Sequence, residues 1–126
     1  MPDATWTEIG SVDELKQRSL QQIVCGQTTL ALSYKDGRFA AISGVCNHIG
    51  GPLGEGRLDG DYVVCPWHYW KFHHKTGQGE AGYEQDQVPV YTIKIENGRL
   101  YIDLSSATKR KKQAHKPHPL ARPVVR

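Results

Sequence analysis

Apolar and polar residues alternate over short stretches of this chain, and turn-forming residues separate these stretches. Residues 5–9 alternate in this way and predict a first strand, and residues 62–65 predict another. Ser11 and Glu14 match a capping box, which favours a brief helical turn over residues 12–17. No amphipathic pattern runs long enough for a substantial helix.

Two hairpins are expected where a residue that tolerates a left-handed backbone precedes glycine. Such dipeptides favour tight turns between antiparallel strands. The dipeptides are Asp36-Gly37, between residues 28–34 and 39–43, and Asn97-Gly98, between residues 90–96 and 100–104. The pattern as a whole predicts an all-β fold, an antiparallel β-sandwich.

The composition changes after Leu104. Residues 1–104 carry a net charge of −4, from nine Lys/Arg and thirteen Asp/Glu, whereas residues 105–126 carry seven Lys/Arg and no acid. The second segment has few large apolar residues with which to offset its ordering entropy, so we expect a disordered tail or an interdomain linker. A docking arm for an acidic partner or an anionic surface is the alternative. No aromatic residue interleaves these charges, which argues against nucleic-acid binding.

The length and cysteine content narrow the class of protein further. A chain of 126 residues suits one domain with a short extension. No apolar stretch is long enough for a transmembrane helix, and no signal peptide is visible at the N-terminus, so we expect no membrane association. Three cysteines fit a reducing compartment, the cytoplasm, because Cys25 is the only one outside the motif described next.

Two short motifs each combine a cysteine with a histidine. Cys46 and His48 are separated by one residue, and Cys65 and His68 by two. Two thiolates and two imidazoles suit a metal site of soft and borderline ligands. Tetrahedral zinc is one candidate, although zinc sites usually pair Cys with Cys and His with His. A [2Fe–2S] cluster with two Cys on one iron and two His on the other is the second candidate.

The sequence around both motifs resembles that of the Rieske ferredoxins and Rieske domains. The resemblance extends over residues 49–56 after the first motif and over residues 69–72 and Thr76-Gly77 after the second. It implies a Rieske-type β-sandwich domain over residues 1–104. A small cluster-binding subdomain, about residues 44–75, would be formed by two loops. It also implies one [2Fe–2S] cluster per chain, with the four ligands Cys46, His48, Cys65 and His68.

The same resemblance indicates the low-potential, oxygenase-associated branch of that family. High-potential relatives place hydroxyl donors where this chain has Trp70 and Phe72, and extra cysteines where it has Gly51 and Trp67. Relatives usually have glycine where Tyr69 stands, which is a departure from the pattern. We expect Trp67 and Tyr69 to shield the cluster or form a docking rim, and Trp70 and Phe72 to pack into the core.

The other histidines, the acidic residues after the second motif and Cys25 are expected to have no role in chemistry. A surface position is the prediction for four histidines, His73, His74, His115 and His118. Adjacent residues of a strand point to opposite faces, so His73 and His74 should not chelate together. A solvated loop is the prediction for Glu80, Glu84 and Asp86, with an acidic docking patch as the alternative. Cys25 is expected to be a buried small hydrophobe.

The function implied by the resemblance is one-electron transfer rather than catalysis by this chain. A flavin-dependent reductase would be the electron donor, and an oxygenase or other oxidoreductase the acceptor. The alternative is the Rieske domain of a larger multidomain redox enzyme, with the basic tail as its interdomain linker. A non-redox module held by zinc is a third hypothesis.

Overall fold

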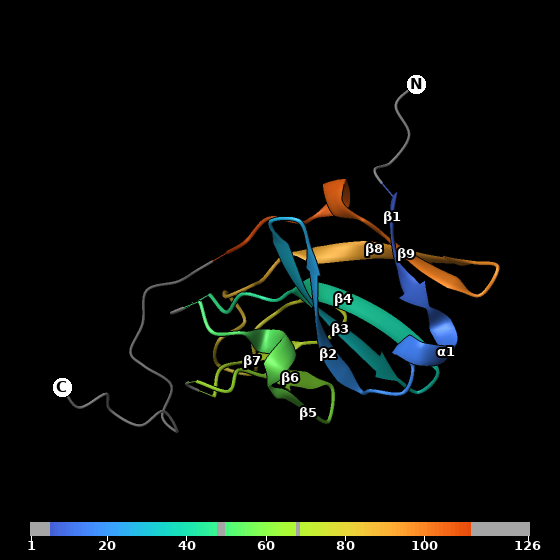
Figure 1. Cartoon of the computed structure of the whole chain (residues 1–126). Coiled ribbons are helices and arrows are strands. Elements are labelled where there is room, and N and C mark those ends of the chain that lie inside the picture. The colour runs from blue at the N-terminus through green and yellow to red at the C-terminus, as the bar shows by residue number, and fades with distance from the viewer. Residues whose placement is uncertain (1–5, 48–49, 68, 112–126) are drawn as a thin grey trace.

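The computed structural model describes residues 6–47, 50–67 and 69–111, and nearly all regular structure in them is β-strand. A six-stranded antiparallel sheet has the order β1-β9-β8-β4-β3-β2, and a three-stranded sheet has the order β5-β6-β7 (Figure 1). The first sheet contains β1 (Trp6–Ser11), β2 (Leu20–Cys25), β3 (Thr28–Lys35), β4 (Arg38–Ser43), β8 (Val90–Glu96) and β9 (Arg99–Asp103). The second contains β5 (Arg57–Asp59), β6 (Tyr62–Val64) and β7 (Lys71–His73). The expected all-β antiparallel fold is confirmed.

Helical structure in the described residues is limited to single turns. These are α1 (Val12–Leu15) and two 3₁₀ turns, η1 (Leu53–Glu55) and η2 (Leu104–Ser106). The position of α1 agrees with the helical turn predicted from the capping box, although the Ser11 side chain makes no capping hydrogen bond. No described helix has the length and apolar character needed to cross a membrane.

Both hairpins occur where the dipeptides predict them. Lys35 pairs with Arg38 and Glu96 pairs with Arg99, which leaves two residues in each turn. Asp36 and Gly37 have φ of 54° and 79°, and the corresponding pair in the second hairpin has 53° and 74°. Positive φ at both central positions matches the strand twist, which is why these dipeptides are favoured there.

Strands β3 and β4 are buried on both faces and divide the core in two. Alternate residues of β3 contribute to different clusters, Leu30 and Leu32 to one and Ala31 to the other. The first cluster lies against β9 and includes Leu100 and Ile102. The second cluster contains Ala31, Ile42, Cys46, Leu53, Val63, Cys65, Trp70, Phe72 and Val88. The two motif cysteines therefore belong to the core that joins the second sheet to the first.

The C-terminal segment differs from the prediction over its first residues. Residues 105–111, expected to be tail, contact the domain: the Val90 amide donates to Thr108 Oγ1 at 3.0 Å, and the Thr92 amide donates to Ser106 Oγ at 2.8 Å. The disorder prediction rested on a lack of apolar side chains, but this segment is held by backbone and polar contacts. Residues 112–126, with His115 and His118, lie outside the described residues, so the tail prediction for them stays a prediction.

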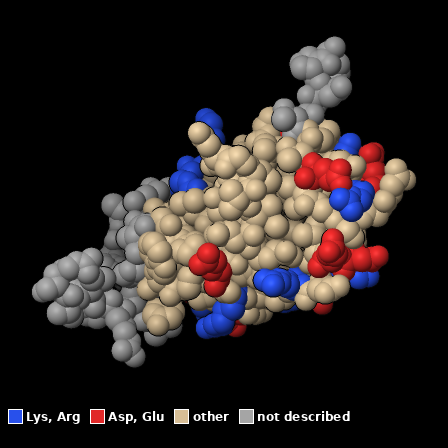
Figure 2. Space-filling view, viewed as in Figure 1, with Lys and Arg blue, Asp and Glu red and all other residues tan. Residues whose placement is uncertain are grey.

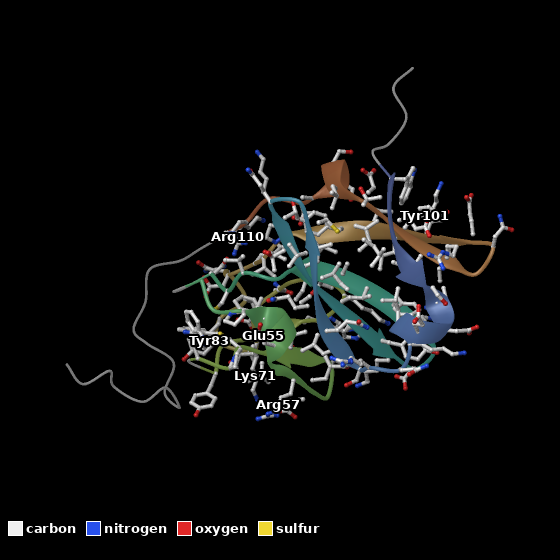
Figure 3. The ribbon with its side chains drawn as sticks, viewed as in Figure 1. Glu55, Arg57, Lys71, Tyr83, Tyr101 and Arg110 are labelled. Atoms are coloured by element: carbon white, nitrogen blue, oxygen red, sulfur yellow. The ribbon has the colours of Figure 1, made fainter. Side chains whose placement is uncertain are left out.

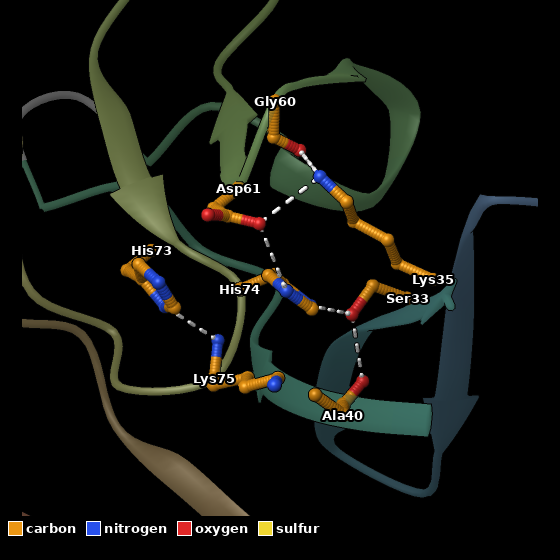
Figure 4. A network of polar contacts seen from close by, with 8 residues as sticks. All are labelled: Ser33, Lys35, Ala40, Gly60, Asp61, His73, His74 and Lys75. Atoms are coloured by element: carbon orange, nitrogen blue, oxygen red, sulfur yellow. Dashed lines mark hydrogen bonds and ion pairs between the residues drawn. The ribbon is translucent and has the colours of Figure 1, made fainter. Parts of the chain in front are cut away.

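His74 is buried, which corrects the expectation of a surface position. It is 2% exposed, and its Nδ1 lies 3.0 Å from Ser33 Oγ on β3 (Figure 4). Its Nε2 lies 4.0 Å from Asp61, whose carboxylate pairs with Lys35 at 3.0 Å. β7 ends at His73, so the strand alternation does not extend to His74, and the two imidazole rings stack with centroids 5.3 Å apart. This network ties the second sheet to β3.

Two smaller expectations also change. Asp86 is 1% exposed, so it does not belong to a solvated loop, whereas Glu84 is exposed as expected. Cys25 is only partly buried, although it does pack against the first core cluster, and burial raises the pKa of its thiol. Trp70 and Phe72 are 3% and 0% exposed, which confirms their predicted place in the core.

Candidate metal centre

Two loops carry the motif cysteines, and both loops close with the same hydrogen bonds. In the first, the Cys46 amide donates to the Gly51 carbonyl at 2.9 Å, and the Gly50 amide donates to the Cys46 carbonyl at 3.2 Å. In the second, the Cys65 amide donates to the Trp70 carbonyl at 2.7 Å, and the Tyr69 amide donates to the Cys65 carbonyl at 3.0 Å. Each cysteine thus bonds to the residues four and five positions later, so the loops have matching backbone closures.

The match extends to the backbone angle at the fourth residue after each cysteine. Gly50 has φ of 74° and Tyr69 has φ of 65°, both in the left-handed region. That region costs an ordinary L-residue roughly 1–2 kcal/mol, whereas glycine enters it freely. The departure noted at Tyr69 therefore falls where the loop closure itself favours glycine. The Tyr69 residue is 36% exposed.

The two loops meet at Gly51. A methyl group at this position would lie 2.6 Å from Cys65 Sγ and 3.4 Å from the Trp67 ring, so only glycine fits without movement. Cys46 is 2% exposed and Cys65 is 0% exposed. The two loops have matching geometry and contact each other at Gly51, and their buried cysteines belong to the same core cluster, which fits the two-thiolate half of the predicted site.

The two histidines of the motifs, His48 and His68, lie outside the described residues. Within the described residues, no group of three or more Cys, His, Asp or Glu side chains is arranged to hold a metal. The assignment of the two imidazoles as ligands therefore stays a prediction.

The first loop is anchored to the sheet on both sides of Cys46. The Gly44 amide donates to the Thr29 carbonyl on β3 at 2.8 Å, and the Leu53 amide donates to the Gly44 carbonyl at 2.9 Å. Gly54 lies directly against Gln22 of β2, where a methyl group would be 2.7 Å from its Cα. These contacts fix where the loop begins and ends relative to the core.

Asn47 is a site residue that the sequence analysis did not identify. It lies between Cys46 and His48, is 7% exposed, and its Nδ2 donates to the Lys111 carbonyl at 2.6 Å. Its Oδ1 accepts a hydrogen bond of 2.5 Å from the Arg110 guanidinium. The partners are 64 and 63 residues away in the sequence, so no local pattern indicates them.

Apolar side chains surround the loops at the surface. Val45, Trp67 and Tyr69 are 40%, 55% and 36% exposed, which agrees with the expectation of a rim for the last two. A hollow of about 300 Å³ opens beside Cys65; it is lined by Glu55, Gly56, Arg57, Val64, Cys65, Pro66 and Tyr69. In Figure 3, Glu55, Arg57 and Lys71 all lie on the side of the molecule formed by η1 and the second sheet.

Comparison with known proteins agrees with this geometry. The model of the Rieske [2Fe-2S] domain matches residues 5–92. The biphenyl dioxygenase ferredoxin subunit of Pseudomonas sp. (strain KKS102) is 35% identical over 104 residues, covering 82% of this chain and 95% of that protein. The human apoptosis-inducing factor 3 is 29% identical over 103 residues, which are 82% of this chain but 17% of that protein.

A solved structure extends the agreement to three dimensions. The ferredoxin of Sphingomonas yanoikuyae B1 superposes with a TM-score of 0.69 at 26% identity, covering 77% of this chain and 96% of that one. The family match includes both cysteine loops and most of both sheets. The chain belongs to the Rieske [2Fe-2S] domain family, and its cofactor is one Rieske-type [2Fe–2S] cluster.

Proposed function

We propose that this chain is a one-electron carrier in which Cys46 and Cys65 bind one iron of the cluster, and His48 and His68 bind the other. The observation that carries the proposal is the pair of loops with matching closures, which bring two buried cysteines together at Gly51. When bound, the cluster accepts and releases one electron. The chain itself holds the ligands in place, excludes water from the sulfurs and presents the rim to a partner.

The acceptor is an oxygenase or another oxidoreductase, and the donor is a flavin-dependent reductase. Support for the acceptor comes from the similar ferredoxin subunit of a dioxygenase. Val45, Trp67 and Tyr69 form an exposed apolar rim around the loops. A partner that docks on this rim would bring its own cofactor close to the cluster, as electron transfer requires. A cytoplasmic location is part of the proposal, because a reducing compartment keeps the cysteines available as ligands.

The reduction potential should lie at the low end of the Rieske range, about −150 mV or slightly above. Hydrogen bonds to cluster sulfurs raise the potential, and Trp70 and Phe72 are buried side chains without a hydroxyl. Voltammetry near neutral pH measures this value. A potential well above zero would contradict the assignment to the low-potential branch.

The composition of the purified protein tests the cofactor and its ligands. We expect two iron and two sulfide per chain, together with an EPR spectrum that shows nitrogen coordination. The H48A and H68A variants should lose the cluster, whereas C25S should keep it, because Cys25 lies outside the motifs. Stoichiometric zinc without sulfide in anaerobically prepared wild-type protein would contradict the proposal.

The alternative is a Rieske domain within a larger redox enzyme. The match to a human protein of which this chain covers only 17% is the observation that favours it. The size of the native polypeptide, measured by immunoblotting of the source cells, separates the alternatives. A band near 14.1 kDa supports the separate carrier, and a much larger band supports the domain of an enzyme.

A further inference from the structure

The residues that follow β9 run back across the molecule to the first cysteine loop. We call residues 105–111 the strap. Thr108 forms a hydrogen bond with each backbone polar group of Val90, at 3.0 and 3.2 Å. Farther along, Lys111 and Gln87 exchange two backbone hydrogen bonds of 2.8 Å each. The strap therefore continues as an added edge beside residues 87–92, and it lies beyond the region that the family model matches.

The strap brings one guanidinium group onto the first loop. Arg110 Nη1 donates to the Val45 carbonyl at 2.9 Å and to Asn47 Oδ1 at 2.5 Å, and Nη2 donates to Ser43 Oγ at 2.8 Å. Val45 and Asn47 are the immediate neighbours of Cys46 in the chain. The planar fork of arginine can satisfy several acceptors at once, which an ammonium group does less well. Arg110 thus holds the loop on both sides of a predicted ligand.

Asn47 completes the connection between strap and loop. Its Nδ2 donates to the Lys111 carbonyl at 2.6 Å and lies 3.4 Å from the Gln87 carbonyl, while its Oδ1 accepts from Arg110. A buried amide needs partners for both of its ends. The described partners of this side chain come from the strap and from Gln87, the residue with which the strap pairs. Loss of the strap would therefore leave Asn47 without these partners, beside Cys46.

The charge of Arg110 acts on the same loop. Partial burial removes water from the Arg110 guanidinium and lowers its pKa, while the electrostatic effect of Cys46 and Tyr91 acts to raise it. An arginine remains protonated at neutral pH in either case. On the face seen in Figure 2, most acidic side chains lie at the end that carries α1, whereas Figure 3 shows Arg110 toward the opposite end. Arg110 thus brings a positive charge to the first loop of a domain that is acidic overall.

We propose that Arg110 is a positioning residue for the electron carrier: it fixes the first cysteine loop and favours the reduced cluster by its positive charge. The inference rests on the proposed function, because it concerns the potential of that cluster. Reduction adds one negative charge, and a fixed cation nearby stabilises the product more than the reactant. The strap is therefore part of the redox site rather than an inert linker.

Three variants separate charge from position. R110Q removes both the charge and most of the fork, R110K keeps the charge but loses the fork, and K109Q removes one charge from an exposed neighbour in the same strap. Each protein is titrated by voltammetry, and amide hydrogen exchange is measured over residues 45–51. The wild-type protein is first assayed for iron, sulfide and its EPR spectrum.

We expect R110Q to lower the ratio of reduced to oxidised cluster at a fixed potential by about three- to tenfold, tenfold being about 59 mV for one electron. K109Q should change this ratio less than about twofold, because three hydrogen bonds hold the Arg110 guanidinium against the loop, whereas none of the described contacts holds Lys109 there, so solvent and salt screen its charge. R110K should preserve the ratio but, like R110Q, speed exchange over residues 45–51. An unchanged ratio in R110Q, or an equal change in K109Q, would overturn the role of the Arg110 charge.

The exchange measurement also decides the outcome if R110Q binds too little cluster to titrate. Unchanged exchange over residues 45–51 would then overturn the proposal, and faster exchange with cluster content restored in R110K would support it. Failure of the proposed function looks different. Wild-type protein without iron and sulfide would overturn the electron carrier and with it the effect on potential, whatever the strap variants do.

Discussion

The two cysteine loops share a backbone closure, but they are held in different ways. The first loop is fastened from outside by polar groups, because Arg110 and the Lys111 carbonyl bond to Val45 and Asn47. Both loops have a side chain buried in the core seven residues after the cysteine, Leu53 in the first and Phe72 in the second, but the second loop adds the buried ring of Trp70 at its end. One local geometry can therefore be stabilised by distant hydrogen bonds or by apolar burial, and the two loops should respond to different mutations.

The largest expected effect comes from the apolar anchor of the second loop. F72A removes a fully buried ring from the core cluster that contains both motif cysteines. A truncation of this kind typically costs about 3–5 kcal/mol, and we expect a correspondingly lower melting temperature with loss of cluster. W67A, at a ring that is 55% exposed, is the matched control and should change the melting temperature little. Equal effects of both variants would contradict the internal anchor.

The contact between the loops is tested by a single methyl group. G51A places a Cβ 2.6 Å from Cys65 Sγ, so the two loops must move apart. We expect reduced iron and sulfide content and faster loss of cluster on dilution. G10A adds the same group at a position where its nearest neighbour, Leu15, is at an ordinary 3.7 Å, and it should retain full cluster content. Normal content in G51A would show that the loops meet elsewhere.

Polar contacts of His74 and Lys35 connect the second sheet to β3, and acid should weaken the contact of His74. Burial lowers the pKa of His74, and the charges of His73, Lys75 and Lys35 lower it further, against the opposing effect of Asp61. A histidine whose folded-state pKa is lowered binds its proton less readily than the unfolded chain does. The free energy of unfolding should therefore fall as the pH decreases below about 6.5, the ordinary pKa of histidine, and level off below the folded-state pKa.

Chemical denaturation at a series of pH values measures this dependence, and H74Q is the comparison. The variant should show a smaller decrease near pH 6.5, because His74 no longer contributes while His48 and His68, if they bind iron, still take up protons on unfolding. It should keep a second decrease below about pH 4, the ordinary range of carboxylates. The second decrease arises because Lys71 and Lys35 lower the pKa values of Asp59 and Asp61, so their stabilisation is lost on protonation. A decrease near pH 6.5 that is as large in H74Q as in the wild-type protein would exclude a contribution from His74.

The smallest expected effect concerns the closure that the loops share. Y69G relieves a positive φ of 65° but loses part of a side chain and adds freedom to the unfolded chain. The gain from the backbone angle and the two losses nearly cancel, so we expect the free energy of unfolding to change by about 1 kcal/mol or less. Y69A keeps the unfavourable backbone angle and removes the ring, and it should be less stable than Y69G. The order of the two melting temperatures shows whether the positive φ of Tyr69 destabilises the folded protein.

The features that could be predicted from the sequence alone are those that depend on residues close together in the chain. Alternation and the two dipeptides Asp36-Gly37 and Asn97-Gly98 predicted the hairpins, because turn geometry depends on the φ angles available to two adjacent residues. The two Cys-His motifs and their flanking residues indicated the family and its cofactor. The burial of Trp70 and Phe72 also agreed with the prediction, since both are large aromatic side chains close to a strand.

The polar residues that are buried at the first loop and between the sheets could be identified only from the folded structure. Asn47 and Arg110 are separated by 63 residues, and His74 and Ser33 by 41, so no local pattern pairs them. Whether a polar side chain can be buried depends on a partner that the fold brings to it, because burial without a hydrogen bond is costly. For the same reason the strap could not be recognised from composition: distant backbone and polar groups, rather than its own apolar surface, hold it against the first loop.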